Sequence, residues 1–109
     1  MANRNAAHTK LVRAVIEYLG YKGIPAWESK TQGQWDAKRG VYRKFRGKKG
    51  VADVTGVMLG TGRTIFVECK TGNAKLTMDQ LNFRNEVETA HALYIVARNL
   101  DDVAAGLQP

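Results

Sequence analysis

Apolar residues return every three or four positions over residues 8–19, and this spacing predicts an amphipathic helix that Gly20 and Gly23 end. The segment 24–28 is a short extended candidate, in which Pro25 favours a position at a sheet edge. Residues 29–50 are polar, basic and punctuated by glycine. We expect them to form a long functional loop that can hold a short helix around 34–39.

The second half of the chain shows a hairpin followed by helix, strand and helix. Two β-rich runs, 51–59 and 63–70, flank a Gly-Thr-Gly turn. The segment Thr77-Met-Asp-Gln80 has the form of a capping box and predicts a helix to about Thr89.

Residues 92–97 suit a buried strand, and 100–107 suit a weak last helix that starts at Asn99 or Asp101. The predicted order is α-β-β-β-α-β-α. We therefore expect an α/β fold, a small mixed sheet flanked by helices, in one domain over residues 1–109.

The geometry of the predicted hairpin decides whether Asp53, Glu68 and Lys70 come together. Side chains alternate along a strand, so Glu68 and Lys70 share one face. A two-residue turn at 60–61 pairs Asp53 with Glu68, and one at 61–62 pairs Asp53 with Lys70. A three-residue turn breaks the arrangement, so the shared face depends on an even-length turn.

Two carboxylates and a lysine on one face can form a hydrolytic site that uses a metal ion. Close carboxylates repel each other unless a cation lies between them, and oxygen ligands of this kind suit Mg²⁺ or Mn²⁺. Lys70 can then contact a scissile phosphate or its attacking water. The alternative is a cross-strand salt bridge on a solvated sheet face, which the three residues alone do not exclude.

The surrounding sequence resembles the D…ExK signature of the PD-(D/E)XK nucleases. Gly50-Val-Ala-Asp53 and Ile65-Phe-Val-Glu68-Cys-Lys70 match its two parts, with Glu17 in a preceding helix and Gln80 in a following one. Together these residues resemble the VRR-NUC family, whose small stand-alone members occur in phages and bacteria. Ala52 stands where the superfamily is named for proline, and a small residue keeps the strand geometry.

The resemblance implies a restriction-endonuclease-like αβββαβ core and a role for each matching residue. By this resemblance Asp53 and Glu68 bind the metal, the backbone carbonyl of Cys69 is a further ligand, and Lys70 is the catalytic lysine.

By the same resemblance Glu17 adds a carboxylate, directly or through metal-bound water, and Gln80 closes the site. Both residues also have structural explanations. Glu17 follows Arg13 by four positions and can form an exposed ion pair, and Gln80 can serve only the capping box. Because Gln80 shares a stripe with Phe83 and Val87, we expect its side chain to face the sheet.

The formal charge of +7 is concentrated in one segment, residues 30–49. Eight basic residues lie there against the single acid Asp36, so the rest of the chain is neutral. Such a segment suits a phosphate backbone, although a solvated basic loop is the alternative. The predicted DNA-binding residues are Lys30, Lys38, Arg39, Arg43, Lys44, Arg46, Lys48 and Lys49.

Aromatic residues interleave with this segment and extend its possible chemistry. Trp27, Trp35, Tyr42 and Phe45 could stack on unpaired bases or pin the loop to the body, and we favour pinning for Trp27. Phosphate contacts position a protein on DNA, whereas contacts to base edges specify the sequence. This basic segment therefore indicates recognition of DNA shape more than of sequence.

Other reactive side chains suggest no competing chemistry. His8 and His91 lack the spacing of zinc ligands, and Cys69, the only cysteine, suits a small buried apolar role. A lone cysteine favours a reducing compartment, and neither a signal region nor a membrane-spanning run is visible. We expect a cytoplasmic protein, in a bacterial cell or a phage-infected host, that does not act in a membrane.

The leading functional expectation is therefore a Mg²⁺- or Mn²⁺-dependent DNA endonuclease. The resemblance implies products with a 3′-hydroxyl and a 5′-phosphate, branched substrates such as Holliday junctions, and a homodimer. One alternative is a non-catalytic DNA-binding module on the same fold. Another is a structural or regulatory protein whose basic loop binds an acidic partner.

Overall fold

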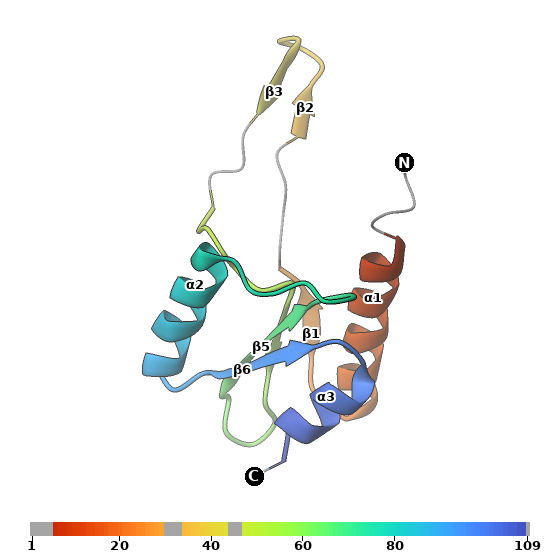
Figure 1. The fold of residues 1–109 in the computed structure, drawn as a ribbon, viewed down its shortest axis with the longest axis vertical. Helices are drawn as coiled ribbons and strands as arrows, with labels where there is room; N and C mark the ends of the chain where they lie inside the picture. Colours follow the sequence, from red (N-terminus) through yellow and green to blue (C-terminus); the bar gives the residue numbers. More distant parts are fainter. Residues whose placement is uncertain (1–5, 30–33, 44–46, 109) are drawn as a thin grey trace.

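The main sheet has four strands and is covered by helices on both faces (Figure 1). The computed structural model describes residues 6–29, 34–43 and 47–108. Within these residues the elements are α1 (Ala6–Tyr21), β1 (Ala26–Glu28), β2 (Gln34–Asp36), β3 (Val41–Arg43), β4 (Val54–Val57), β5 (Thr64–Cys69), α2 (Met78–Thr89), β6 (Leu93–Ala97) and α3 (Leu100–Gly106).

The sheet order is β1-β4-β5-β6, with the first two pairs antiparallel and β5-β6 parallel. An α/β fold with a mixed sheet is thus confirmed. The predicted order of elements is also found, with one extra hairpin, β2-β3, between β1 and β4.

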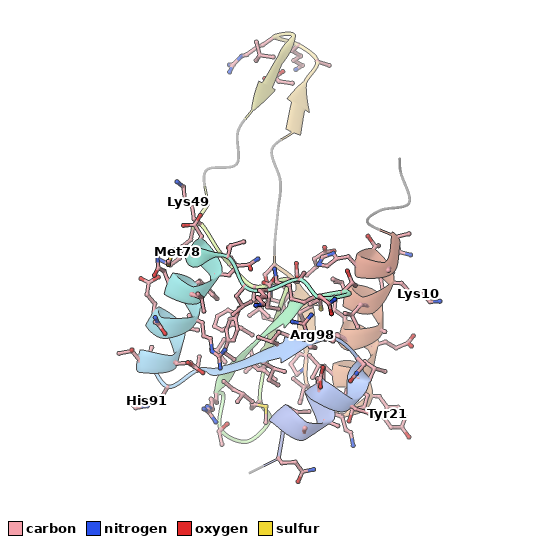
Figure 2. All side chains as sticks on the ribbon, viewed as in Figure 1. Lys10, Tyr21, Lys49, Met78, His91 and Arg98 are labelled. Atoms are coloured by element: carbon pink, nitrogen blue, oxygen red, sulfur yellow. The ribbon has the colours of Figure 1, made fainter. Side chains whose placement is uncertain are left out.

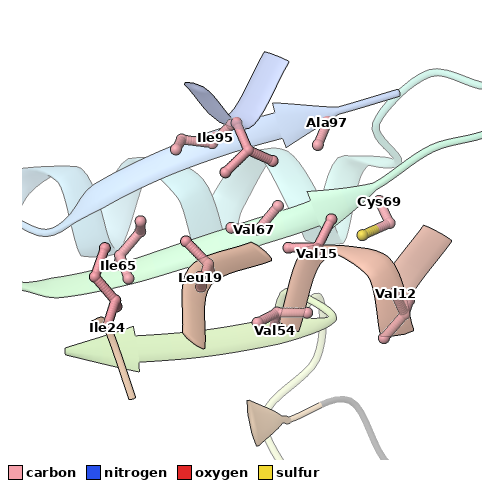
Figure 3. Close-up of a cluster of buried hydrophobic side chains, with 11 residues drawn as sticks. Val12, Val15, Leu19, Ile24, Val54, Ile65, Val67, Cys69, Ile95 and Ala97 are labelled. Atoms are coloured by element: carbon pink, nitrogen blue, oxygen red, sulfur yellow. The ribbon is translucent and has the colours of Figure 1, made fainter. Parts of the chain in front are cut away.

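Two apolar clusters hold the helices on the sheet. Val12, Val15 and Leu19 of α1 lie on the inner faces of β4, β5 and β6, where α3 joins them (Figure 3). The helical spacing of these residues explains why one side of α1 is fully buried. On the opposite face, Phe83 of α2 packs on Tyr94 and Ala52.

The β4-β5 hairpin has the first of the two predicted registers. Val54 lies opposite Val67, and the Met58 N–H donates to the Arg63 carbonyl at 2.8 Å. The turn therefore spans four residues, 59–62, and the prediction of a two-residue turn is wrong. Its even length keeps the register that sets Asp53 against Glu68.

The predicted short helix at 34–39 is wrong, because β2 and β3 form a second antiparallel hairpin there. The Asp36 side chain closes its turn by accepting hydrogen bonds from the Lys38 and Arg39 N–H groups at 3.1 and 3.2 Å. Gly40 then adopts a φ of 66°, which few other residues tolerate. This hairpin, the β2-β3 arm, stands away from the main sheet (Figure 1).

Both predicted helix starts in the second half of the chain are confirmed. Thr77 and Gln80 form a reciprocal capping box at α2, and Asn99 caps α3 by accepting from the Asp102 N–H. Across the described ranges we find no helix with the length and apolar character needed to cross a membrane.

Gly50 lies against the start of α2, and its lack of a side chain lets its backbone approach the Asp79 carbonyl closely. Its φ is 76°, and a Cβ atom there would lie 2.1 Å from the Asp79 carbonyl oxygen. We predict that Gly50→Ala lowers the free energy of unfolding by about 3 kcal/mol, because backbone strain and steric overlap act together. Urea denaturation measures this change.

Gly60→Ala is the matched control. Gly60 has a φ of 83°, but a Cβ atom added there, in the β4-β5 turn, would meet nothing within 4 Å. Only the left-handed backbone is penalised at this position, at a cost of about 1 kcal/mol. Equal destabilisation by the two substitutions would show that the contact with Asp79 contributes nothing.

Candidate active site

Asp53 and Glu68 meet at the C-terminal end of β5. Asp53 directly precedes β4, Glu68 lies in β5, and each residue is only 1% exposed. Carboxylates are rarely buried this deeply unless they are paired or bind a cation. A salt bridge on a solvated sheet face, the simpler explanation of the motif, does not describe two carboxylates that are closed to solvent.

The Asp53 carboxylate is held from two sides. The Cys69 backbone N–H donates to Asp53 Oδ2 at 2.8 Å, and His8 Nε2 lies 3.2 Å from the same oxygen. The Asp53 carbonyl accepts from the Ser29 N–H at 2.8 Å. The Cys69 backbone therefore lies at the site, while its side chain is buried in the α1 cluster, as predicted.

Lys70 follows β5 and places an ammonium group beside Glu68. Its backbone N–H donates to the Ala97 carbonyl at 3.0 Å, which continues the pairing with β6. Lys70 Nζ lies 3.7 Å from Glu68 Oε2, and the side chain is 12% exposed. The lysine thus offsets part of the carboxylate charge and still reaches the surface.

Gln80 serves the helix cap and the site at once. Its Oε1 accepts from the Thr77 N–H at 2.9 Å, as a capping box requires. That bond orients the amide so that Nε2 donates to Glu68 Oε2 at 3.1 Å. The side chain is buried, and it faces the sheet as its position on the stripe of α2 predicted.

Arg98 fixes the loop that separates Lys70 from α2. Its guanidinium group donates to the carbonyls of Gly72 at 3.0 Å and Ala74 at 2.7 Å. Figure 2 shows Arg98 close to this loop, near the centre of the molecule. Arg98 therefore helps to set the position of Lys70 relative to Gln80, a role that no sequence motif indicated.

The first helix brings His8, and not Glu17, to Asp53. Glu17 is exposed and lies about two and a half turns along α1 from His8, on the opposite side of the helix. The predicted site role of Glu17 does not match this placement. The signal for His8 was present, since it continues the spacing of Val12, Val15 and Leu19 along the buried side.

Tyr94 lies under the site on the face covered by α2. It is 6% exposed, and its hydroxyl has no hydrogen-bond partner within the part of the chain that the structure describes. Burial, followed by the negative charge of Glu68, raises the pKa of Tyr94 far above its ordinary value. The hydroxyl is therefore protonated at every physiological pH. Sequence reasoning missed this residue.

The structure places the basic segment in two parts. Lys38 and Arg39 are exposed in the turn of the β2-β3 arm. Lys48 and Lys49 are exposed beside the start of α2, where Figure 2 labels Lys49 near Met78. Lys48 Nζ lies 3.0 Å from Glu86 Oε1 of that helix. Outside the described residues or side chains are Lys30, Arg43, Lys44 and Arg46.

Among the aromatic candidates the structure describes the side chain of Trp27. It is 50% exposed on the edge strand β1, and its role in pinning the loop stays a prediction. The backbones of Trp35 and Tyr42 are paired across the β2-β3 arm. Their side chains, and the whole of Phe45, lie outside the described part.

The described side chains that could donate to a metal ion at the end of β5 are the carboxylates of Asp53 and Glu68, with the His8 ring beside Asp53. In residues 6–29, 34–43 and 47–108 no three His, Cys, Asp or Glu side chains converge as metal ligands. Mg²⁺ needs fewer, because it commonly uses one or two carboxylates, several waters and substrate phosphates. Asp53 and Glu68 fit a hard cation of that kind.

Five polar side chains thus gather at one end of β5: His8, Asp53, Glu68, Lys70 and Gln80. They come from two neighbouring strand ends and two helices, and three of them are buried. Their chemistry and geometry are the basis for assigning a function. Comparison with protein-family models and with curated proteins finds no match for the chain.

Proposed function

We propose that the chain is a metal-dependent DNA endonuclease of the PD-(D/E)XK type, with a VRR-NUC-like, restriction-endonuclease-like core. The observation that carries this proposal is the burial of Asp53 and Glu68 side by side, with Lys70 beside them. Two buried carboxylates at one strand end repel each other, and Lys70 offsets only part of their charge. The arrangement is explained when the carboxylates hold a cation that the reaction uses.

The proposed cation is Mg²⁺ or Mn²⁺, held by Asp53 and Glu68 with the Cys69 carbonyl as a further oxygen ligand. When bound, such an ion lowers the pKa of a coordinated water and neutralises charge on the phosphate. The protein orients the two carboxylates. The Cys69 N–H holds one carboxylate, and the Gln80 amide holds the other.

Lys70 is proposed to act on the phosphate itself. Its ammonium group is on the accessible side of Glu68, where it can contact a non-bridging phosphate oxygen and stabilise the negative charge that develops during attack. Cleavage is expected to leave a 3′-hydroxyl and a 5′-phosphate.

Exposed cations near the site support DNA as the substrate. Lys48 and Lys49 precede Gly50, which packs on the first turn of α2, and Lys38 and Arg39 are carried by the arm. Lysine and arginine at exposed positions bind the phosphate backbone whatever its sequence. A branched substrate and a two-fold symmetric homodimer are parts of the same proposal.

A cleavage panel tests the proposal. Four-way junction, flap, nicked and linear DNA are incubated with the protein in Mg²⁺, Mn²⁺ or EDTA. We expect cleavage only with a divalent ion and most cleavage of branched DNA. Salt-dependent binding of DNA without cleavage under any condition would favour a non-catalytic DNA-binding module. Binding without salt dependence would instead favour a protein with an acidic partner.

The proposed metal binding can be tested without measuring cleavage. Mn²⁺ at about 100 times its dissociation constant should stabilise the folded chain by about 2.7 kcal/mol, because a ligand that binds only the folded state shifts the unfolding equilibrium. Thermal unfolding should show a rise in Tm for the wild type and little rise for Asp53→Asn. A rise of the same size in both proteins would exclude Asp53 as a ligand.

A further inference from the structure

The described segments that flank the β2-β3 arm in the sequence, Ser29 and residues 47–52, lie at the candidate active site. On one side, the Ser29 N–H donates to the Asp53 carbonyl at 2.8 Å, and Ser29 Oγ donates to the Ala52 carbonyl at 2.8 Å. On the other side, Gly50 packs on the first turn of α2 and leads directly into Asp53. DNA held at Asp53 therefore lies next to the segments between which the arm is inserted in the sequence.

The arm is a small β-ribbon whose described hydrogen bonds are internal. Three residue pairs join its strands, from Gln34 with Arg43 to Asp36 with Val41. The Gly40 N–H donates to the Asp36 carbonyl at 2.8 Å and closes the turn. A two-stranded hairpin alone is marginally stable in water, so an arm of this kind benefits from a surface to bind.

The exposed end of the arm is positively charged. Lys38 and Arg39 form its turn, and the only acid of the segment, Asp36, uses Oδ1 to accept from their backbone N–H groups. Arg39 Nε lies 4.0 Å from Asp36 Oδ2, but the Arg39 side chain is 73% exposed, so the remaining N–H groups of its guanidinium can contact phosphate. The major groove of DNA admits a two-stranded β-ribbon, which matches the shape of the arm.

From this placement we infer that the β2-β3 arm is the element that recognises a branch point in DNA. One duplex lies at Asp53, Glu68 and Lys70, and the arm contacts a second duplex where the two meet. A linear duplex offers the arm no second duplex. The inference rests on the proposed function, since it assigns recognition of the branched substrate to one element. DNA binding tests the inference, and DNA cleavage tests the proposed function.

Fluorescence anisotropy in EDTA, which withholds the divalent ion, tests the inference without cleavage. The variant is Lys38→Gln with Arg39→Gln, and the ligands are a four-way junction and a linear duplex of the same arm sequence. We expect the preference for the junction to fall at least about fivefold. The slope of log affinity against log salt concentration for the junction should fall by the equivalent of about two phosphate contacts. The control is Arg13→Gln with Lys22→Gln, which removes the same charge from exposed positions on and after α1.

The result that overturns the inference is an unchanged preference in the arm variant, an equal loss of affinity for both ligands, or a wild type that binds both equally. These outcomes leave the nuclease proposal open to the cleavage panel. Conversely, a wild type that prefers the junction through its arm but cleaves nothing supports the inference and contradicts the nuclease proposal.

A cross-linking experiment locates the arm on the DNA. Cys69 is 1% exposed, so the variant Ala37→Cys, at an exposed position in the turn of the arm, carries one accessible thiol for an aryl azide label and keeps Lys38 and Arg39. The label should cross-link the junction at nucleotides next to the branch point. Cross-links spread evenly along the duplex arms would show that the β2-β3 arm binds phosphate without regard to branching.

Discussion

Asp53→Asn is expected to lower the rate of DNA cleavage by at least about 10³-fold without unfolding the protein. Asparagine keeps the size of the side chain and an oxygen that can accept the Cys69 N–H, which donates to Asp53 Oδ2 at 2.8 Å in the wild type. It removes the negative charge that a divalent cation requires. Single-turnover cleavage with Mn²⁺ measures the rate, and thermal unfolding measures the stability.

Asp101→Asn is the control, because it makes the same change at an exposed position in the first turn of α3. It should cleave DNA at the wild-type rate. We expect the metal-free Asp53→Asn protein to be at least as stable as the wild type, since the substitution removes repulsion between two buried carboxylates. Full cleavage activity in Asp53→Asn would remove the proposed metal centre.

Lys70→Ala has the second largest expected effect, a loss of about 10²- to 10³-fold in the cleavage rate. The ammonium group lies 3.7 Å from Glu68 Oε2 and is the cation that the site itself provides for the phosphate. DNA binding should change little, because Lys38, Arg39 and Lys49 remain exposed. Anisotropy and single-turnover cleavage, measured on one DNA, separate the two effects.

Lys75→Ala is the matched control for this substitution. Lys75 carries the same charge and is exposed in the loop between β5 and α2, five positions after Lys70. Its loss should leave the cleavage rate within about twofold of the wild type. If both alanine variants cleave equally well, Lys70 has no role beyond its ion pair with Glu68.

Local patterns predicted the parts of the structure that local interactions determine. The capping box at Thr77 and Gln80 is a contact over three positions, and the β4-β5 register follows from the spacing around one turn. That register sets Asp53 against Glu68, which is one of the two pairings that the sequence left open for an even-length turn.

The predictions that failed depend on the chemistry of a turn or on which side of a helix faces the sheet. The segment 34–39 is a hairpin because the Asp36 side chain and Gly40 close a tight turn. Glu17 and His8 lie on opposite sides of one helix, and the side of α1 that packs on the sheet decides which of them meets Asp53. The motif alone did not contain that information.

Arg98 and Tyr94 could not be predicted for a different reason. Their roles depend on contacts between segments that are distant in the sequence. Arg98 binds carbonyls more than twenty positions away, and Tyr94 comes under Glu68 because β6 pairs in parallel with β5. A single sequence carries no signal for such contacts when no motif includes the residue.

The central claim is that Asp53, Glu68 and Lys70 form a hydrolytic centre that works with a divalent cation. Its most direct test is single-turnover cleavage of a four-way junction, labelled on one strand, by the wild type and Lys70→Ala side by side in Mn²⁺. We predict site-limited cleavage by the wild type that EDTA abolishes, and a rate at least about 10²-fold lower for the variant. Equal rates for the two proteins, including no cleavage by either, would contradict it.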